Sequence, residues 1–277
     1  MGSPAEPVTG LPRALTIAGS DSGGGAGIQA DLKVFFALGC HGMSAVTALT
    51  AQNTLGVSDI HVVPPSFVRA QIDAVAGDIG VDAAKTGMLA SAGIAEAVAD
   101  ALSAHDIQKI VVDPVFVSKH RDRLLAEDAV SAVKTRLFPL ATVITPNLYE
   151  AGALLGDTEI ATLGEMKEAA VELGALGPRS VLVKGGHLPG DRAVDVFWDG
   201  NQCSEIAGPR YDTEDTHGTG CALSAAITAL LARGDDLVAA VYGGKRFVSG
   251  AIRRSIRLGK GFGPVNPFWE FLSGKQG

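Results

Sequence analysis

Residues 15–31 read LTIAGSDSGGGAGIQAD and predict a strand, a turn and a helix in succession. Its first part, residues 15–19, is a short apolar run typical of a buried strand, and residues 26–38 carry apolar side chains at helical spacing. The glycines between them allow a tight turn, because a residue without a Cβ atom adopts backbone angles that other residues avoid. A strand, a turn and a helix in this order form the repeating unit of an α/β protein.

The same alternation continues along the chain and predicts a mostly parallel sheet with helices on both faces. Further buried strands are expected at residues 45–50, 109–113, 142–145 and 181–184. Helices are expected at residues 65–76, 91–104, 126–137, 148–155, 163–176, 220–233 and 236–256. Residues 194–198 and 202–206 flank a tight turn and predict a hairpin that adds an antiparallel edge. We expect one domain at residues 13–277, after a disordered leader at residues 1–12.

The composition excludes several classes of protein. Of the 277 residues, 47% are hydrophobic and 19% are charged, which excludes a disordered chain. The net charge of −7 argues against a partner such as nucleic acid or a membrane surface. Three cysteines are too few for a disulfide framework, and no apolar run reaches the length of about 18 residues that indicates a transmembrane helix. We therefore expect a cytoplasmic protein.

Two glycine-rich segments precede predicted helices, at the edge of the sheet where ligands bind in such folds. The first, residues 18–27, has neither the G-x-G-x-x-G spacing of dinucleotide-binding proteins nor the lysine of a phosphate loop. The N–H groups at the start of the following helix are expected to be free for a ligand. The alternative is a plain turn between a strand and a helix.

The second segment, residues 215–221, reads DTHGTGC and runs into an alanine-rich helix. Its small residues should leave successive N–H groups pointing into one concavity at the positive end of the helix dipole, which predicts an anion hole for a phosphoryl group. Cys221 lies in the first turn, where the dipole is expected to lower the pKa of the thiol and favour the thiolate. The alternative is a capped helix start with a buried cysteine.

Three further polar residues follow predicted strands. Asn147 and Glu150 share one face of a helix start, where they could hold hydrated Mg²⁺ or form a capping box. Lys184 ends a strand before two glycines, and it could reach a polyphosphate or lie in solvent. Together with the two glycine-rich segments, these residues indicate a site that handles phosphate.

Seven short stretches resemble the ribokinase-like superfamily and, within it, the hydroxymethylpyrimidine/phosphomethylpyrimidine kinases of thiamine biosynthesis. They are LTIAGSDSGGGAGIQAD at 15–31, TALTAQNTLG at 47–56, KTGML at 85–89, DPVFV at 113–117, TPNLYE at 145–150, VKGGH at 183–187 and HGTGC at 217–221. The resemblance implies a three-layer α/β/α sandwich, ATP and Mg²⁺ as cofactors, and a homodimer. It also implies two successive phosphorylations of 4-amino-5-hydroxymethyl-2-methylpyrimidine (HMP), first to the monophosphate and then to the diphosphate.

The resemblance assigns roles to the residues that match it. The residues expected to line the pyrimidine pocket are Gly19, Asp21, Ala26, Gln52, Met88 and Val115. The Gln52 amide offers both a donor and an acceptor to the edge of the ring. The residues expected to bind ATP are Asn147, Glu150, Lys184, Thr216 and Lys245, and Glu150 would hold Mg²⁺ through water. The expected catalytic residues are Lys184, Gly218, Gly220 and Cys221, with Cys221 as the base that deprotonates the alcohol.

The sequence departs from the family at two places. Residues 118–122 read SKHRD, with Arg121 where the family often has glycine, and Phe116 stands where methionine is common. One alternative is a pyridoxal (vitamin B6) kinase, because related enzymes share the Gly-Thr-Gly-Cys segment but add a single phosphate. The other alternative, from a different class, is a ligand-binding regulatory module that has lost turnover.

Overall fold

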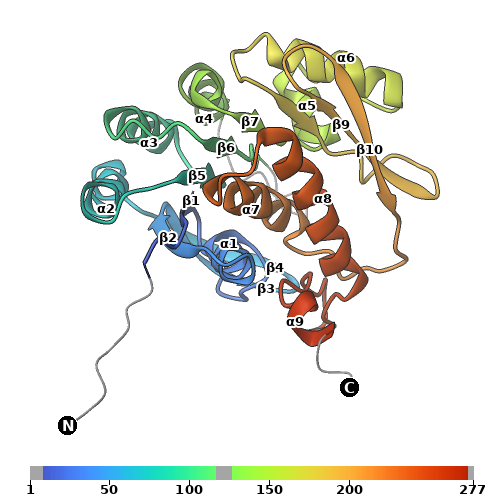
Figure 1. Cartoon of the computed structure of the whole chain (residues 1–277), viewed down its shortest axis with the longest axis horizontal. Helices are drawn as coiled ribbons and strands as arrows, with labels where there is room; N and C mark the ends of the chain where they lie inside the picture. Colours follow the sequence, from blue (N-terminus) through green and yellow to red (C-terminus); the bar gives the residue numbers. More distant parts are fainter. Residues whose placement is uncertain (1–8, 117–126, 274–277) are drawn as a thin grey trace.

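A computed structural model describes residues 9–116 and 127–273 of the chain. A central sheet of eight strands runs through the molecule (Figure 1). In spatial order its strands are β10 (Cys203–Pro209), β9 (Arg192–Trp198), β8 (Val181–Val183), β7 (Val143–Ile144), β6 (Ile110–Val112), β5 (Ala83–Thr86), β1 (Arg13–Ala18) and β2 (His41–Val46). Within this sheet, β8, β7, β6, β5, β1 and β2 are parallel to one another, whereas β9 runs antiparallel to both of its neighbours.

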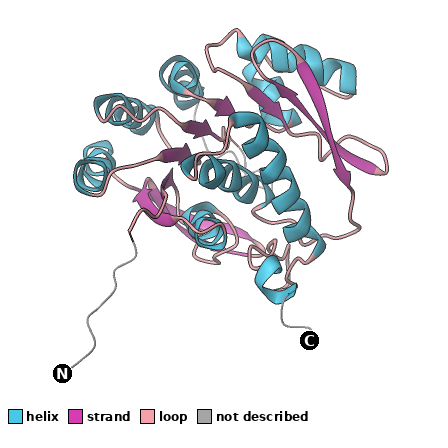
Figure 2. Ribbon diagram, viewed as in Figure 1, coloured by secondary structure: helices cyan, strands magenta, loops and turns pink. Residues whose placement is uncertain are grey.

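Helices cover both faces of this sheet, which gives the predicted three layers (Figure 2). One face is covered by α2 (Pro65–Asp78), α3 (Ala92–Ala104), α4 (Glu127–Ala132), α5 (Leu148–Leu154) and α6 (Leu163–Gly174), and α4 continues into a π-helical turn (Val133–Leu137) and a 3-10 turn (Phe138–Leu140). The other face is covered by α1 (Gly27–Ala37), α7 (Thr219–Ala232) and α8 (Leu237–Arg253), and α9 (Trp269–Ser273) packs against α8.

Helix α7 occupies the centre of its layer, where it packs against the sheet and is flanked by α1 and α8 (Figure 1). Its residues from Ala222 to Leu231 are buried, which explains why the helix consists of small and apolar side chains on all sides. Helix α7 packs against β1, β5 and β6. A Cβ atom on Gly220, in its first turn, would lie 3.3 Å from Lys184 Nζ, after β8, and 3.7 Å from Asp113 Oδ2, after β6, so polar residues that follow these two strands lie beside the start of α7.

The structure confirms most of the predicted elements, including the hairpin β9–β10. The strand predicted at residues 45–50 is wrong as a single strand, because the chain leaves the main sheet at Thr47. There, Thr47 N donates to Ala18 O, and Thr47 O accepts from Val63 N. The following residues form a separate two-stranded sheet, β3 (Ala48–Asn53) and β4 (Gly56–Val62), in which most side chains are exposed or half-buried.

Strands β4 and β5 and helix α9 are absent from the sequence prediction. Strand β5 escapes it because its four residues include Lys85, a residue type that is almost never fully buried without a partner. Residues 1–8 of the expected leader and the loop at residues 118–122 lie outside the described residues. Over residues 9–116 and 127–273, no helix combines the length and apolar character needed to cross a lipid bilayer.

Candidate active site

Lys184 and two acidic residues form a buried cluster at the ends of three parallel strands. Lys184 Nζ donates to Asp113 Oδ1 at 2.8 Å and lies 3.9 Å from Glu150 Oε2. Asp113 also accepts hydrogen bonds from the hydroxyls of Thr145 and Ser224, at 3.0 and 3.2 Å. The Lys184 side chain keeps 15% of its surface exposed, against 2% for Asp113, so the lysine is the member of this cluster that can meet a ligand.

Asn147 and Glu150 form the predicted capping box at the start of α5. Asn147 N donates to Glu150 Oε2 at 2.8 Å, and Glu150 N donates to Asn147 Oδ1 at 2.9 Å. Burial raises the pKa of the Glu150 carboxyl to about 7, although the nearby Lys184 acts in the opposite direction. A further cation beside this carboxyl would favour its charged form.

The oxygen donors at this position suit Mg²⁺ held mainly by water and phosphate. Glu150 supplies one carboxylate beside Lys184, and Mg²⁺ commonly uses one or two carboxylates together with substrate phosphates. Across the described residues, no group of three or more His, Cys, Asp or Glu side chains is placed to enclose a metal ion. The described residues therefore offer only a partial set of ligands to a metal ion.

The glycine-rich segment before α7 forms an open cradle of backbone N–H groups. Gly218 has a positive φ of 77°, and a Cβ atom at this position would stand 1.9 Å from Gly25 O, so only glycine fits. Within the described part of the chain, the N–H groups of Gly218, Gly220 and Cys221 donate to no acceptor. A Cβ atom on Gly220 would lie 3.3 Å from Lys184 Nζ, which shows that the lysine faces the cradle.

In the first glycine-rich segment, by contrast, backbone N–H groups already have an acceptor within the segment. The Asp21 carboxylate accepts hydrogen bonds from Gly23 N at 2.8 Å, Gly25 N at 3.0 Å and Ala26 N at 2.8 Å. The expectation that N–H groups at this helix start are free for a ligand is therefore wrong for these three residues. The segment carries its own anion, because the chain turns Asp21 back into the concavity that the amides create.

Asp21 also connects the two segments, since Asp21 Oδ2 lies 3.0 Å from His217 Nε2. Burial opposes the charge on Asp21, but the hydrogen bonds to His217 and to the backbone hold its pKa below the usual value. Only 2% of Asp21 is exposed. The structure thus places Asp21 inside the wall of the expected pyrimidine pocket, where it organises the loop.

Among the other residues expected to line the pyrimidine pocket, Gly19 and Met88 contact each other, and Gln52 contacts the first glycine-rich segment. Gly19 N donates to Met88 O at 3.1 Å, so the ends of β1 and β5 meet there. The backbone N–H and carbonyl of Gln52 bond to Ser22 Oγ, which holds β3 against the first glycine-rich segment. The half-buried Val115 follows Asp113 at the end of β6, and Ala26 caps α1. Gln52 Oε1 accepts from Thr50 Oγ1 at 3.1 Å.

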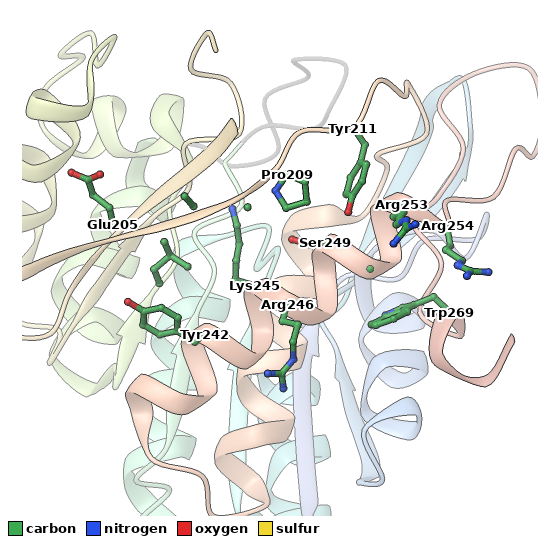
Figure 3. Close-up of a pocket in the computed structure, with 14 residues that line it drawn as sticks. Glu205, Pro209, Tyr211, Tyr242, Lys245, Arg246, Ser249, Arg253, Arg254 and Trp269 are labelled. Atoms are coloured by element: carbon green, nitrogen blue, oxygen red, sulfur yellow. The ribbon is translucent and has the colours of Figure 1, made fainter. Parts of the chain in front are cut away.

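Lys245 and Thr216, both expected near ATP, belong to different segments, Lys245 to α8 and Thr216 to the segment before α7. Lys245 Nζ is 2.7 Å from Asp195 Oδ2, and Asp195 Oδ1 accepts from Gly185 N, the residue after Lys184. Lys245 also stands in the wall of an open cleft of about 720 Å³ between β10 and α8 (Figure 3). Thr216 accepts hydrogen bonds from Thr219 at the start of α7, so it belongs to the cradle.

The expected lowering of the Cys221 pKa is wrong for this structure. Burial raises the pKa of the thiol to about 11, which outweighs the effects of Lys85 and of the Gly27 N–H group.

Lys85 and Asp113 are charged residues of the site to which the sequence analysis gave no role. Their positions in the sequence could have identified them, because Lys85 and Asp113 are the first residues of the KTGML and DPVFV stretches, each at or beside a strand end.

Comparison with known proteins places this geometry in a family. The sequence model described as phosphomethylpyrimidine kinase matches residues 21–266. A hydroxymethylpyrimidine/phosphomethylpyrimidine kinase of Streptomyces coelicolor is 51% identical over 269 residues, which cover 97% of this chain and 98% of that protein. An ADP complex of Bacillus subtilis pyridoxal kinase superposes with a TM-score of 0.89 at 41% identity, covering 95% of this chain and 100% of that one. A phosphomethylpyrimidine kinase of Clostridium difficile 630 gives a TM-score of 0.77 at 42% identity, covering 87% and 99%. The chain belongs to the phosphomethylpyrimidine kinase family.

Proposed function

We propose that this member of the family transfers the γ-phosphoryl group of ATP first to HMP and then to HMP phosphate, in thiamine biosynthesis. The S. coelicolor relative is named for both reactions and matches nearly the whole chain. The structural observation that carries the proposal is the open cradle of Gly218, Gly220 and Cys221 N–H groups facing Lys184. A phosphoryl group in transfer needs this kind of fixed positive surroundings.

In the proposed complex, the migrating phosphoryl group lies between the cradle and Lys184. Three N–H groups at the positive end of α7 and one ammonium group then face its oxygens, which lowers the energy of the charge that spreads over them. Asp113 holds the ammonium in place through the hydrogen bond of 2.8 Å. Mg²⁺, held through water by Glu150 and near Asn147, would neutralise phosphate charge when it is bound.

The two acceptors make different demands on the site. The primary alcohol of HMP must lose a proton as it attacks, whereas HMP phosphate already has anionic oxygens at neutral pH. Cys221 lies in the first turn of α7, next to the cradle, and we assign it as the base for the alcohol, in its thiolate form. Because burial raises the pKa of this thiol to about 11, the thiolate needs a stabilising charge nearby.

The pyrimidine ring is proposed to occupy the pocket of Gly19, Ala26, Gln52, Met88 and Val115. The Gln52 amide forms hydrogen bonds with the edge of the ring, and Met88 and Val115 form apolar walls. Asp21 lies behind this surface and fixes its shape. The nucleoside of ATP is proposed to lie toward the cleft between β10 and α8, because Lys245 and Asp195 connect that cleft to Gly185 beside Lys184.

Pyridoxal kinase is the second candidate, favoured by the TM-score of 0.89 with the B. subtilis enzyme. ADP release with HMP, HMP phosphate and pyridoxal, followed by product mass, separates the candidates. We expect release with the first two acceptors and a product that carries two phosphates. A product with one phosphate from pyridoxal alone would assign the chain to vitamin B6 metabolism, and no release with any acceptor would indicate a regulatory module.

We also propose that the protein works as a homodimer in the cytoplasm. The small sheet β3–β4 presents exposed apolar side chains, namely Leu49, Leu55, Ile60 and Val62, and a second copy could cover them. Light scattering during size-exclusion chromatography measures the molar mass and tests this assignment.

A further inference from the structure

Lys85 and Asp31 form an ion pair in the interior of the molecule. Lys85 lies on β5 and Asp31 on α1, and Lys85 Nζ is 3.0 Å from each carboxylate oxygen of Asp31. Thr16 Oγ1 of β1 donates to Asp31 Oδ2 at 2.6 Å. Both charged side chains are completely buried. The function proposed above uses neither residue.

Stability alone is a weak reason for this pair. A buried ion pair loses the hydration of two charges, and apolar residues of similar size often stabilise a fold equally well. The ammonium group is also incompletely bonded, because its acceptors among the described residues are the two oxygens of Asp31, while it has three hydrogens to donate. A buried and partly unsatisfied cation points to a role outside packing.

The position of the Lys85 ammonium group indicates what this role is. Helix α7 packs across β5, and the end of β5 leads through Gly87, whose Cβ position is 3.4 Å from Lys85 Nζ, to the pocket residue Met88. Lys85 therefore lies under helix α7 and beside the segment that leads to the pocket. Four charged side chains act on the Cys221 thiol. Lys85 from β5 and Lys184 after β8 favour the thiolate, whereas Asp31 from α1 and Asp113 after β6 oppose it, each less strongly than Lys85 favours it.

We propose that Lys85 is a positioning residue for the first phosphorylation, whose buried ammonium group, oriented by Asp31 and Thr16, stabilises the Cys221 thiolate. The proposal rests on the assignment of Cys221 as the base. In this step the hydroxyl proton of HMP passes to the Cys221 sulfur, and the hydroxyl oxygen bonds to the γ-phosphorus. The bond from that phosphorus to the oxygen of ADP breaks, ADP leaves, and the thiol returns its proton to solvent.

The test uses a double variant that removes both charges and keeps the side-chain sizes, Lys85→Met with Asp31→Asn. The asparagine oxygen can still accept from Thr16, so the local hydrogen bond is kept. The measurement is the rate of alkylation of Cys221 by iodoacetamide from pH 7 to pH 10, followed by peptide mass. Cys203 in the same sample is the internal control, because it lies next to Lys167 O, away from the pair.

We expect the alkylation of Cys221 at pH 8 to slow about three- to tenfold in the double variant, with Cys203 unchanged, because one pKa unit changes the thiolate fraction tenfold. We expect kcat for HMP to fall by a similar factor, with kcat for HMP phosphate within about twofold of wild type. An unchanged alkylation profile, or an equal fall in both kcat values, would overturn the proposal.

Two further measurements keep the test decisive. If the double variant does not fold, the measurements are repeated on Lys85→Met with Asp31→Leu, which replaces the ion pair by two apolar side chains. If the pair served only to stabilise the fold, activity should return in this variant together with thermal stability. The base assignment is tested separately by the kinetics of Cys221→Ala, which do not depend on the alkylation measurement. If Cys221→Ala slows both phosphorylations equally, the base assignment fails, whatever the Lys85 variants show.

Discussion

The two glycine-rich loops of the site, residues 19–27 and 217–221, lie side by side and both lead into helices. They differ in what their backbone N–H groups contact. In the first loop, three of these groups donate to the carboxylate of Asp21, which belongs to the same loop. In the second loop, the N–H groups of Gly218, Gly220 and Cys221 donate to no acceptor in the residues that the structure describes.

The difference shows that glycines before a helix do not by themselves make an anion site. A loop that supplies its own carboxylate becomes a rigid wall, whereas a loop that leaves its donors open can receive a phosphoryl group. We therefore expect changes in the first loop and its neighbours to act mainly on substrate KM. Changes in the second loop should act mainly on kcat.

The largest effect is expected for Gly220→Ala in the open loop. The added methyl group would stand 3.3 Å from Lys184 Nζ and occupy the space for the phosphoryl oxygens. We expect kcat to fall about 100- to 1000-fold for both phosphorylations, with a similar Tm. The control is Gly164→Ala, at the same kind of position in α6, where the new Cβ meets only Thr162 Oγ1 at 3.8 Å. Full activity in Gly220→Ala would contradict the assignment of the cradle.

Cys221→Ala should separate the two reactions. Loss of the base should reduce kcat for HMP about 100-fold, whereas kcat for HMP phosphate should stay within a few-fold, because a phosphate monoester needs no base. Single-turnover rates with each acceptor measure this ratio. Equal losses in both reactions would show that Cys221 only positions the acceptors.

A change beside the closed loop should alter recognition of the ring. Gln52→Leu keeps the side-chain volume and removes the amide, so we expect the KM for HMP to rise about 10- to 100-fold with little change in kcat. Gln202→Leu, on the exposed turn of the hairpin, is the control. Steady-state kinetics with HMP check this, and an unchanged KM would remove Gln52 from the pocket.

The smallest kinetic effect is expected for Asp21→Asn, which can no longer accept all the N–H groups of the closed loop. At pH 7 we expect the free energy of unfolding to fall by about 2 kcal/mol, with KM raised a few-fold. The folded state lowers the pKa of Asp21, so its contribution to stability is present above pH 4 or so and is lost as pH falls through the lowered value. Urea unfolding at pH 7 and pH 3 should show the two proteins converging in acid.

The sequence was sufficient for the elements whose patterns are local. The run before Gly19, the Asp-Gly-Asn turn of the hairpin and the HGTGC segment each predict a structure that is present. Strand β5 could not be predicted, because Lys85 is tolerated inside only through Asp31, which lies 54 residues earlier. The role of Asp21 also depends on three-dimensional folding, since only the turned loop brings its carboxylate under its own amides. The pKa of the Cys221 thiol also depends on three-dimensional folding, because burial by neighbouring elements determines it.

The contact between Gly25 O and Gly218 has a consequence for how such a scaffold can diversify. A Cβ atom on Gly218 would meet Gly25 O, and one on Gly25 would meet the ring of His217, so neither position has room for a side chain. Under the proposed function, new ring preferences would then arise by exchanging side chains such as Gln52 and Met88 on an unchanged main chain. Relatives that accept different vitamin precursors can then inherit one phosphate-transfer apparatus and alter only the lining of the neighbouring pocket.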